Sequence, residues 1–95
     1  MNKRIEKFAL KGVDGEVIRI PADWATVMKV GVQERWLYAW ILLEDQSVPT
    51  RNQKAITFFL RQSGELLDDL PMYARYVDSI QVETDTPILH VWVLD

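Results

Sequence analysis

The sequence contains no cysteine and only one histidine. The lack of cysteine excludes disulfide bonds, thiolate zinc sites and cysteine nucleophiles. A metal site built from several histidines of one chain is excluded as well. Glycine and proline are scarce, with four of each in 95 residues, and no segment is typical of a flexible linker. We therefore expect one compact domain over residues 1–95, without a cofactor or a bound metal.

The sequence also has no long apolar run. No stretch reaches the roughly 18 residues of a membrane helix, and the basic start lacks the apolar segment of a signal peptide. The composition, 48% hydrophobic and 26% charged, is that of an ordinary folded domain. We expect a cytoplasmic protein with no membrane partner.

Charge is unevenly distributed along the chain, although the net charge is only −3. Residues 1–61 contain ten Lys and Arg against seven Asp and Glu, whereas residues 62–95 contain only Arg75 against seven acids. An acidic chain does not attract nucleic acid through its overall field. This distribution favours a protein partner, or a second copy of the chain, over nucleic acid.

The apolar residues that are present fall into short runs separated by turn signals, which is typical of an all-β domain. Residues 16–20 alternate between apolar and polar, and the preceding Asp14-Gly15 pair predicts a tight hairpin turn. The polar residues 44–53 are predicted to form a surface loop. The pattern predicts a mostly-β fold, a small sandwich or barrel of about seven antiparallel strands over residues 4–11, 16–20, 25–33, 36–43, 55–60, 74–83 and 88–94.

One run, Trp36–Leu43, is apolar at every position. A buried helix gives the same pattern, but the aromatic content favours a strand. A strand covered on one face alternates, so this one is predicted to be covered on both faces or to lie centrally in a closed sheet. A chain of this length provides little material for such cover. We therefore expect a homodimer or a higher homo-oligomer.

A single short helix is predicted near residues 64–70. Ser63 is a suitable cap, Glu65 lies in the first turn where the helix dipole favours an acid, and Pro71 ends the segment. Three leucines of this segment would share one face of the helix.

Three stretches of the sequence resemble a family of short uncharacterised proteins encoded by tailed bacteriophages. The resemblance implies a phage origin, a small mostly-β fold and the cytoplasm of the host cell as location, and it brings no assigned activity. Members usually carry a Gly-Thr-Gly-His turn where this chain has residues 60–64, so no role of that histidine is transferred. The matching stretches are Ile5-Glu6-Lys7-Phe8 leading to Ile18-Arg19-Ile20-Pro21, then Leu37–Asp45, and finally Tyr76–Ile80 with Leu89–Val93.

The aromatic content is the strongest functional signal, with four Trp and three Tyr. A small core can take Trp40 and Trp92, but Trp24 and Trp36 are harder to bury because each ring carries about 150–250 Å² of surface. Aromatic rings left at a surface are typical binding anchors. A tryptophan-rich core is the alternative. We therefore predict that these two tryptophans and four basic residues form a binding surface. The predicted binding residues are Trp24, Trp36, Arg35, Arg51, Lys54 and Arg61.

Nucleic-acid binding is a second interpretation of some of the same residues. Lys54, Phe58, Phe59 and Arg61 mix basic and aromatic side chains on one predicted strand, as platforms for single strands do. Successive residues of a strand point to opposite faces, so the two phenylalanines cannot line one stacking surface. With an acidic chain as well, nucleic acid is the less favoured partner.

A small hydrolase that uses His90 as a general base is the third hypothesis. The sequence supplies no nucleophile motif to complete such a site, and a partly buried, hydrogen-bonded histidine is the ordinary interpretation. Glu65, Asp68 and Asp69 lack the spacing of a calcium loop or a zinc protease and are interpreted as a solvated face.

Together these observations favour a non-enzymatic phage accessory protein that acts by protein–protein binding. Its partner would be a host or phage protein, or a second copy of itself. By analogy with other small phage proteins, inhibition of a host enzyme or defence system is the expected role.

Overall fold

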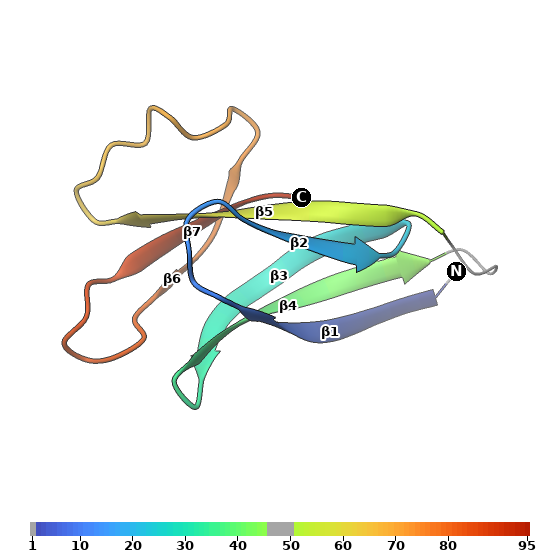
Figure 1. Ribbon diagram of the computed structural model, residues 1–95, viewed down its shortest axis with the longest axis horizontal. Helices are drawn as coiled ribbons and strands as arrows, with labels where there is room; N and C mark the ends of the chain where they lie inside the picture. The colour runs from blue at the N-terminus through green and yellow to red at the C-terminus, as the bar shows by residue number, and fades with distance from the viewer. Residues whose placement is uncertain (1, 46–50) are drawn as a thin grey trace.

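The structure is a computed structural model that describes residues 2–45 and 51–95. All regular structure in these ranges is β (Figure 1). The strands are β1 (Asn2–Leu10), β2 (Glu16–Pro21), β3 (Trp24–Gln33), β4 (Trp36–Asp45), β5 (Gln53–Gln62), β6 (Arg75–Ile80) and β7 (Leu89–Leu94).

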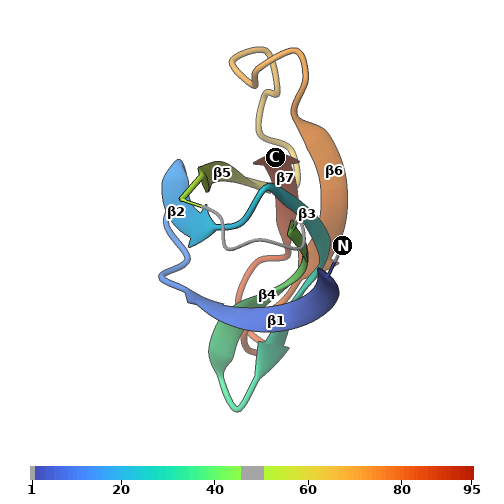
Figure 2. The same cartoon turned by 90° about the vertical axis from the view of Figure 1, so that its right-hand side faces the viewer.

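The strands form two antiparallel sheets. The three-stranded sheet has the order β1-β4-β3, and the four-stranded sheet has the order β2-β5-β7-β6. In Figures 1 and 2 the two sheets pack face to face as a sandwich. The prediction of a mostly-β fold with seven short antiparallel strands is therefore confirmed.

The core lies between the sheets and is filled by alternate residues of the central strands. On the three-stranded side, β4 contributes four buried side chains: Leu37, Ala39, Ile41 and Leu43. On the other side, β5 and β7 contribute Ile56, Phe58, Val91 and Val93. Each large side chain buried in this way contributes about 1.5–3 kcal/mol to folding, so the inner faces of these strands hold the sheets together.

The edge of β3 that faces away from β4 connects the two sheets beside a β-bulge between Val27 and Lys29. Because β3 is an edge strand, the N–H and carbonyl of Val27 are available to partners outside its own sheet. Arg75 Nη2 of β6 donates to the carbonyl of Val27 at 2.6 Å, and the Val27 N–H donates to the Asp95 carboxylate at 2.9 Å. Arg75 and Asp95 also form an ion pair at 2.6 Å, so these residues connect β3 to β6.

The predicted helix near residues 64–70 is wrong. The segment instead contains separate tight turns, with hydrogen bonds from the Glu65 N–H to the Gln62 carbonyl and from the Leu70 N–H to the Leu67 carbonyl. Gly64 adopts φ +91°, which interrupts a helix at its first residues. A segment this short forms a helix only when packing supports it, and its leucines have no core face to pack against.

The turn expected at Asp14-Gly15 exists, but it does not join two paired strands. Gly12 and Gly15 both adopt positive φ, +81° and +80°, as the sequence indicates. They carry the chain from β1 in one sheet to β2 in the other, so the predicted hairpin is wrong. The tight hairpin is instead the two-residue turn between β3 and β4 at Glu34-Arg35.

The loop predicted over residues 44–53 is shorter than expected at both ends. β4 extends to Asp45 and β5 begins at Gln53. Residues 46–50 lie outside the described residues.

Candidate binding surface

The outward side of the three-stranded sheet carries most of the tryptophans. β4 is the central strand of this sheet, which is open and not closed, and its inward residues are buried in the core. The expected cover on its second face is not provided by the described part of the chain, where Trp36 is 66% exposed. We call this outward side the aromatic face; it is formed by Trp24, Ile5, Lys7, Lys29, Gly31, Trp36, Tyr38, Trp40 and Leu42.

Two lysines flank the rings at the middle of the aromatic face. Lys7 of β1 and Lys29 of β3 lie opposite Trp40 on either side of β4. The Lys7 Nζ lies 4.5 Å from the ring centroid of Tyr38, and the Lys29 Nζ lies 5.5 Å from that of Trp40. A cation over an exposed ring contributes about 0.5–1 kcal/mol. The face is therefore both aromatic and basic.

A glycine allows the Trp40 indole to lie across the neighbouring strand. A Cβ atom added at Gly31 would lie 3.4 Å from the Cζ3 atom of Trp40. Tyr38, directly opposite Gly31, is tilted by 57° relative to Trp40, with ring centroids 6.3 Å apart. The Trp40 indole thus packs close to Gly31, with Tyr38 beside it on the open side of the sheet.

None of the four tryptophans belongs to the core, which overturns the expectation for Trp40 and Trp92. Both are half-buried on the outward sides of their sheets. Trp24 is 45% exposed and Trp36 more so. The narrow space between the sheets is filled by aliphatic side chains and Phe58, so the larger indoles are left outside.

The structure separates the six predicted binding residues. Trp24 pairs with Glu44 at one end of β4 and Trp36 begins the strand. The two indoles are thus about 27 Å apart along the sheet at the usual rise per residue. Lys54 lines a cavity of about 210 Å³ together with Trp24. Arg35 lies at the turn beside Trp36, and Arg51 is exposed just before β5.

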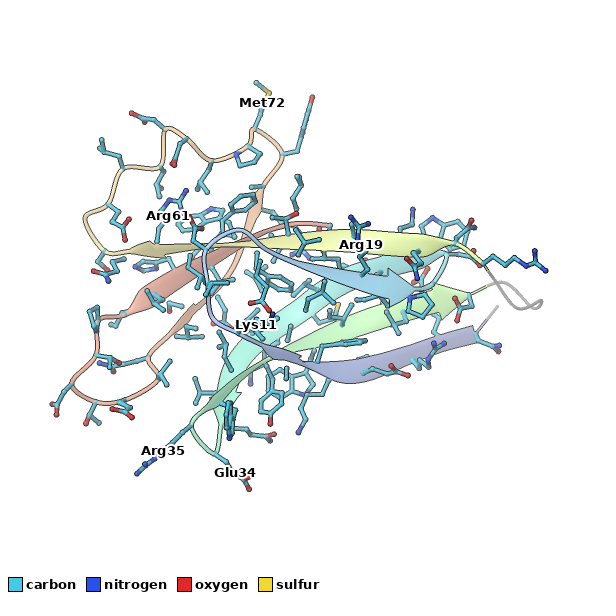
Figure 3. All side chains as sticks on the ribbon, in the orientation of Figure 1. Lys11, Arg19, Glu34, Arg35, Arg61 and Met72 are labelled. Atoms are coloured by element: carbon cyan, nitrogen blue, oxygen red, sulfur yellow. The ribbon has the colours of Figure 1, made fainter. Side chains whose placement is uncertain are left out.

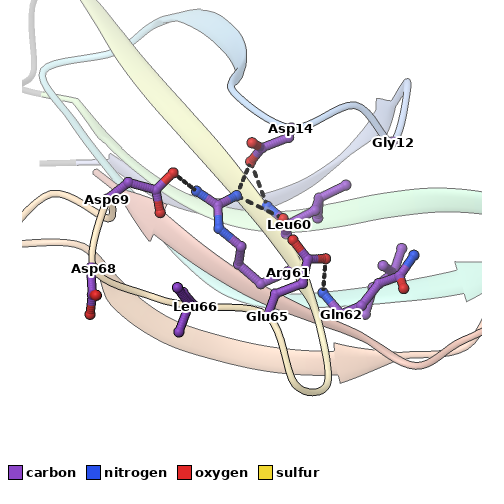
Figure 4. A pocket seen from close by; sticks show the side chains of 10 residues that line it. Gly12, Asp14, Leu60, Arg61, Gln62, Glu65, Leu66, Asp68 and Asp69 are labelled. Atoms are coloured by element: carbon purple, nitrogen blue, oxygen red, sulfur yellow. Dashed lines mark hydrogen bonds and ion pairs between the residues drawn. The ribbon is translucent and has the colours of Figure 1, made fainter.

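Arg61 lies away from the aromatic face; it is only 6% exposed and lines a cavity of about 730 Å³ with residues of the loop that follows β5. Figure 4 shows its guanidinium between Asp14, at 2.7 Å, and Asp69, at 3.1 Å. It also donates to the carbonyl of Leu60 at 2.8 Å. Burial would lower the pKa of Arg61, but hydrogen bonds to Asp69 and Asp14 outweigh it and raise the pKa. Arg61 therefore remains charged and anchors both adjoining loops.

With the geometry established, the chain can be compared with known proteins. A family model described as "Domain of unknown function (DUF7352)" matches residues 1–95. The chain belongs to this family. No curated protein and no solved structure matches it. The function of this DUF7352 chain must therefore be argued from its own residues.

His90 lies in a second cavity, on the outward side of the four-stranded sheet. Its Nε2 is 2.8 Å from the Ser63 hydroxyl, and its Nδ1 is 3.4 Å from the Tyr76 hydroxyl. Trp92 packs edge-on against Tyr76 at 5.1 Å, and the cavity measures about 510 Å³. The Ser63–His90 pair could not be predicted from a sequence motif, because Ser63 follows β5 and His90 lies in β7, far apart in the chain.

Within residues 2–45 and 51–95, no group of three or more His, Asp or Glu side chains could hold a metal ion. The same residues contain no helix able to cross a bilayer.

Proposed function

We propose that the chain acts by protein–protein binding through the aromatic face. The observation that supports this most is the position of the tryptophans, which lie outside the core, two of them largely open to solvent. Large exposed rings gathered on one sheet face are typical of a binding site, and tryptophan is the residue type most often found to dominate interface energies.

The charges of the aromatic face indicate what such a partner would present. Lys7 and Lys29 lie among the rings, and Arg35 adjoins Trp36. The outward acid of β4, Glu44, is paired with Lys3 at 3.7 Å. Complementarity favours a partner whose surface combines apolar side chains with Asp and Glu. A phage accessory role, with inhibition of a host enzyme or defence system, extends this proposal by way of the family resemblance.

The proposal is tested with the purified chain as bait in a bacterial lysate, in parallel with and without nuclease treatment. Retained proteins are identified, purified and titrated against the bait. We expect Trp36→Ala to raise the dissociation constant about 30-fold, which corresponds to the roughly 2 kcal/mol of an interface hot spot. Val17→Ala, on the outward side of the other sheet, is the matched control and should bind normally.

Equal binding by the Trp36→Ala variant and the unchanged chain would contradict the proposal. Retention that disappears on nuclease treatment and weakens steeply with salt would favour a nucleic-acid partner instead. A nucleic acid could also contact the lysines and rings of the aromatic face. The comparison of lysates with and without nuclease therefore distinguishes a nucleic-acid partner from a protein partner.

A second candidate function rests on the short contact between Ser63 and His90. A histidine nitrogen 2.8 Å from a serine hydroxyl can accept its proton as the oxygen attacks an ester carbonyl. The ester C–O bond then breaks and the alcohol leaves with that proton, after which water, deprotonated by the same histidine, releases the acyl group as a carboxylic acid. In this arrangement Tyr76, not a carboxylate, faces the second ring nitrogen. Hydrolysis of a nitrophenyl ester that is lost equally in Ser63→Ala and His90→Ala would support it, and unchanged hydrolysis in both would dismiss it.

A further inference from the structure

We infer that the aromatic face binds residues 63–74 of a second copy of the chain. This inference rests on the proposed function, because it names a partner for the same surface. Residues 63–74, which we call the acidic loop, connect β5 to β6 and project away from the sandwich (Figures 1 and 2).

The acidic loop exposes an unusual amount of apolar surface. Leu66 is 78% exposed and Met72 is 88% exposed. Leu67 and Tyr73 are also exposed on the same short segment. Single exposed apolar residues are ordinary, but several on one projecting loop indicate a contact surface.

The charges of the acidic loop are opposite to those of the aromatic face. The loop contains Glu65, Asp68 and Asp69 and no Lys or Arg. Asp68 is exposed, and Asp69 keeps 75% of its side chain exposed even while paired with Arg61. The aromatic face offers Lys7 and Lys29 between its rings. The loop therefore has the apolar and acidic character that this face favours.

The loop is also held in shape before it meets a partner. The ion pair with Arg61 holds Asp69 against the sheet. Three tight turns order the backbone, and in each a backbone N–H, that of Glu65, Leu70 or Ala74, donates to the carbonyl three residues earlier. A preordered segment loses less conformational entropy on binding. Its exposed side chains are presented by a fixed scaffold.

The two surfaces cannot meet within one chain. In Figure 3, Met72 lies at the upper extreme of the molecule, whereas Glu34 and Arg35 mark the opposite end, where the aromatic face begins. A contact between them must join two copies through different surfaces. Such a head-to-tail contact builds rings or open chains of copies, and in an open chain each of the two end copies keeps one free surface.

Two variants, each with one surface removed, provide the test. The face variant carries Lys29→Glu and Trp36→Glu, and the loop variant carries Leu66→Lys and Met72→Lys. All four positions are exposed, so folding should be retained, which circular dichroism verifies. We expect the unchanged chain to grow in mass with concentration in sedimentation equilibrium, less so at high salt. Each variant alone should remain a monomer.

The decisive measurement is an equimolar mixture of the two variants. Each supplies the surface that the other lacks, so the mixture should form a 1:1 dimer and stop growing. Asp85→Lys at the turn between β6 and β7 is a charge control and should associate like the unchanged chain. A monomeric unchanged chain, or a mixture that stays monomeric, would overturn the inference. If the chain does not self-associate but the face variant no longer binds the protein retained from the lysate, the proposed function still holds and only the self-association is excluded.

Discussion

At the scale of single residues, the turn between β3 and β4 places two unsuitable side chains in left-handed backbone. Glu34 has φ 52° and Arg35 has φ 69°, a region that asparagine and glycine tolerate better. The predicted strands over residues 25–33 and 36–43 leave these two residues as their connection, although neither residue favours such a turn. The strain lies directly beside the most exposed tryptophan, and strained backbone is often found near functional surfaces.

Replacing both residues should relieve this strain. We expect Glu34→Asn together with Arg35→Gly to raise the free energy of unfolding by about 1 kcal/mol, measured by urea denaturation. Arg19→Gly, which places glycine inside β2, is the contrasting control and should lower stability by about 0.5–1 kcal/mol. A double variant less stable than the unchanged chain would show that the turn is not strained.

Asp95 gives a second residue-level prediction, on pH. Its side chain is only 13% exposed. Burial would raise its pKa, but hydrogen bonds from Arg75 and the Val27 N–H outweigh it and lower the pKa below the ordinary 3.8. A carboxyl with a lowered pKa stabilises the fold above its unfolded pKa, and this stability is lost as the pH falls through the folded pKa.

Asp95→Asn should therefore lower the free energy of unfolding at neutral pH. The difference from the unchanged chain should begin to shrink as the pH falls below about 4 and should be lost once the pH is below the lowered pKa of folded Asp95, where both chains carry a neutral side chain. Thermal unfolding followed from pH 7 to pH 2 measures this. A difference that stays constant across the range would exclude the proposed linkage.

At the scale of elements, Arg61 determines how the acidic loop is held. We expect Arg61→Met to lower stability by about 1–3 kcal/mol, since charge-assisted hydrogen bonds are lost. Amide hydrogen exchange should become faster over residues 63–74 and stay unchanged in β4. Arg19→Met, which removes an exposed cation of β2, should change neither the stability nor the hydrogen exchange of the loop. Equal protection of the loop in the Arg61 variant would mean that the turns alone order it.

The elements also show where sequence patterns succeed. Two strands were predicted correctly, from the alternation in residues 16–20 and from the continuous apolar run of β4. Both predictions succeeded because the spacing of apolar residues along a strand reflects which of its side chains are buried. The prediction of a helix near residues 64–70 was wrong because it rested on capping residues, which are local signals. A helix there would also have needed a core surface to pack against, which the fold does not provide. The hairpin at Asp14-Gly15 failed because a turn residue specifies φ and not which strands pair.

The candidate binding surface was predictable only where composition and local pattern determine it. The excess of tryptophan over core space pointed to Trp24 and Trp36 as exposed, and this holds. The gathering of Lys7, Lys29 and Tyr38 around Trp40 depends on cross-strand register, which no local pattern gives. Arg61 is buried and lies away from the aromatic face, which could not be predicted because an arginine in a sequence carries no sign of its burial.

At the scale of the whole molecule, stability and binding reside in different residues. Because Trp36 lies outside the core, Trp36→Ala should change the free energy of unfolding by no more than about 0.5 kcal/mol. Ile41→Ala, one strand position away from the aromatic face but pointing into the core, should cost about 2–5 kcal/mol. Chemical denaturation of both variants tests this, and a large loss for Trp36→Ala would indicate a structural role for that ring.

The placement of the indoles has a practical consequence for spectroscopy. Emission from tryptophans in contact with water lies at longer wavelength than emission from a dry core, so the folded chain should already fluoresce towards the red. Denaturation would then shift its spectrum little, whereas covering the rings would shift it to the blue. Intrinsic fluorescence should thus follow complex formation without any attached label.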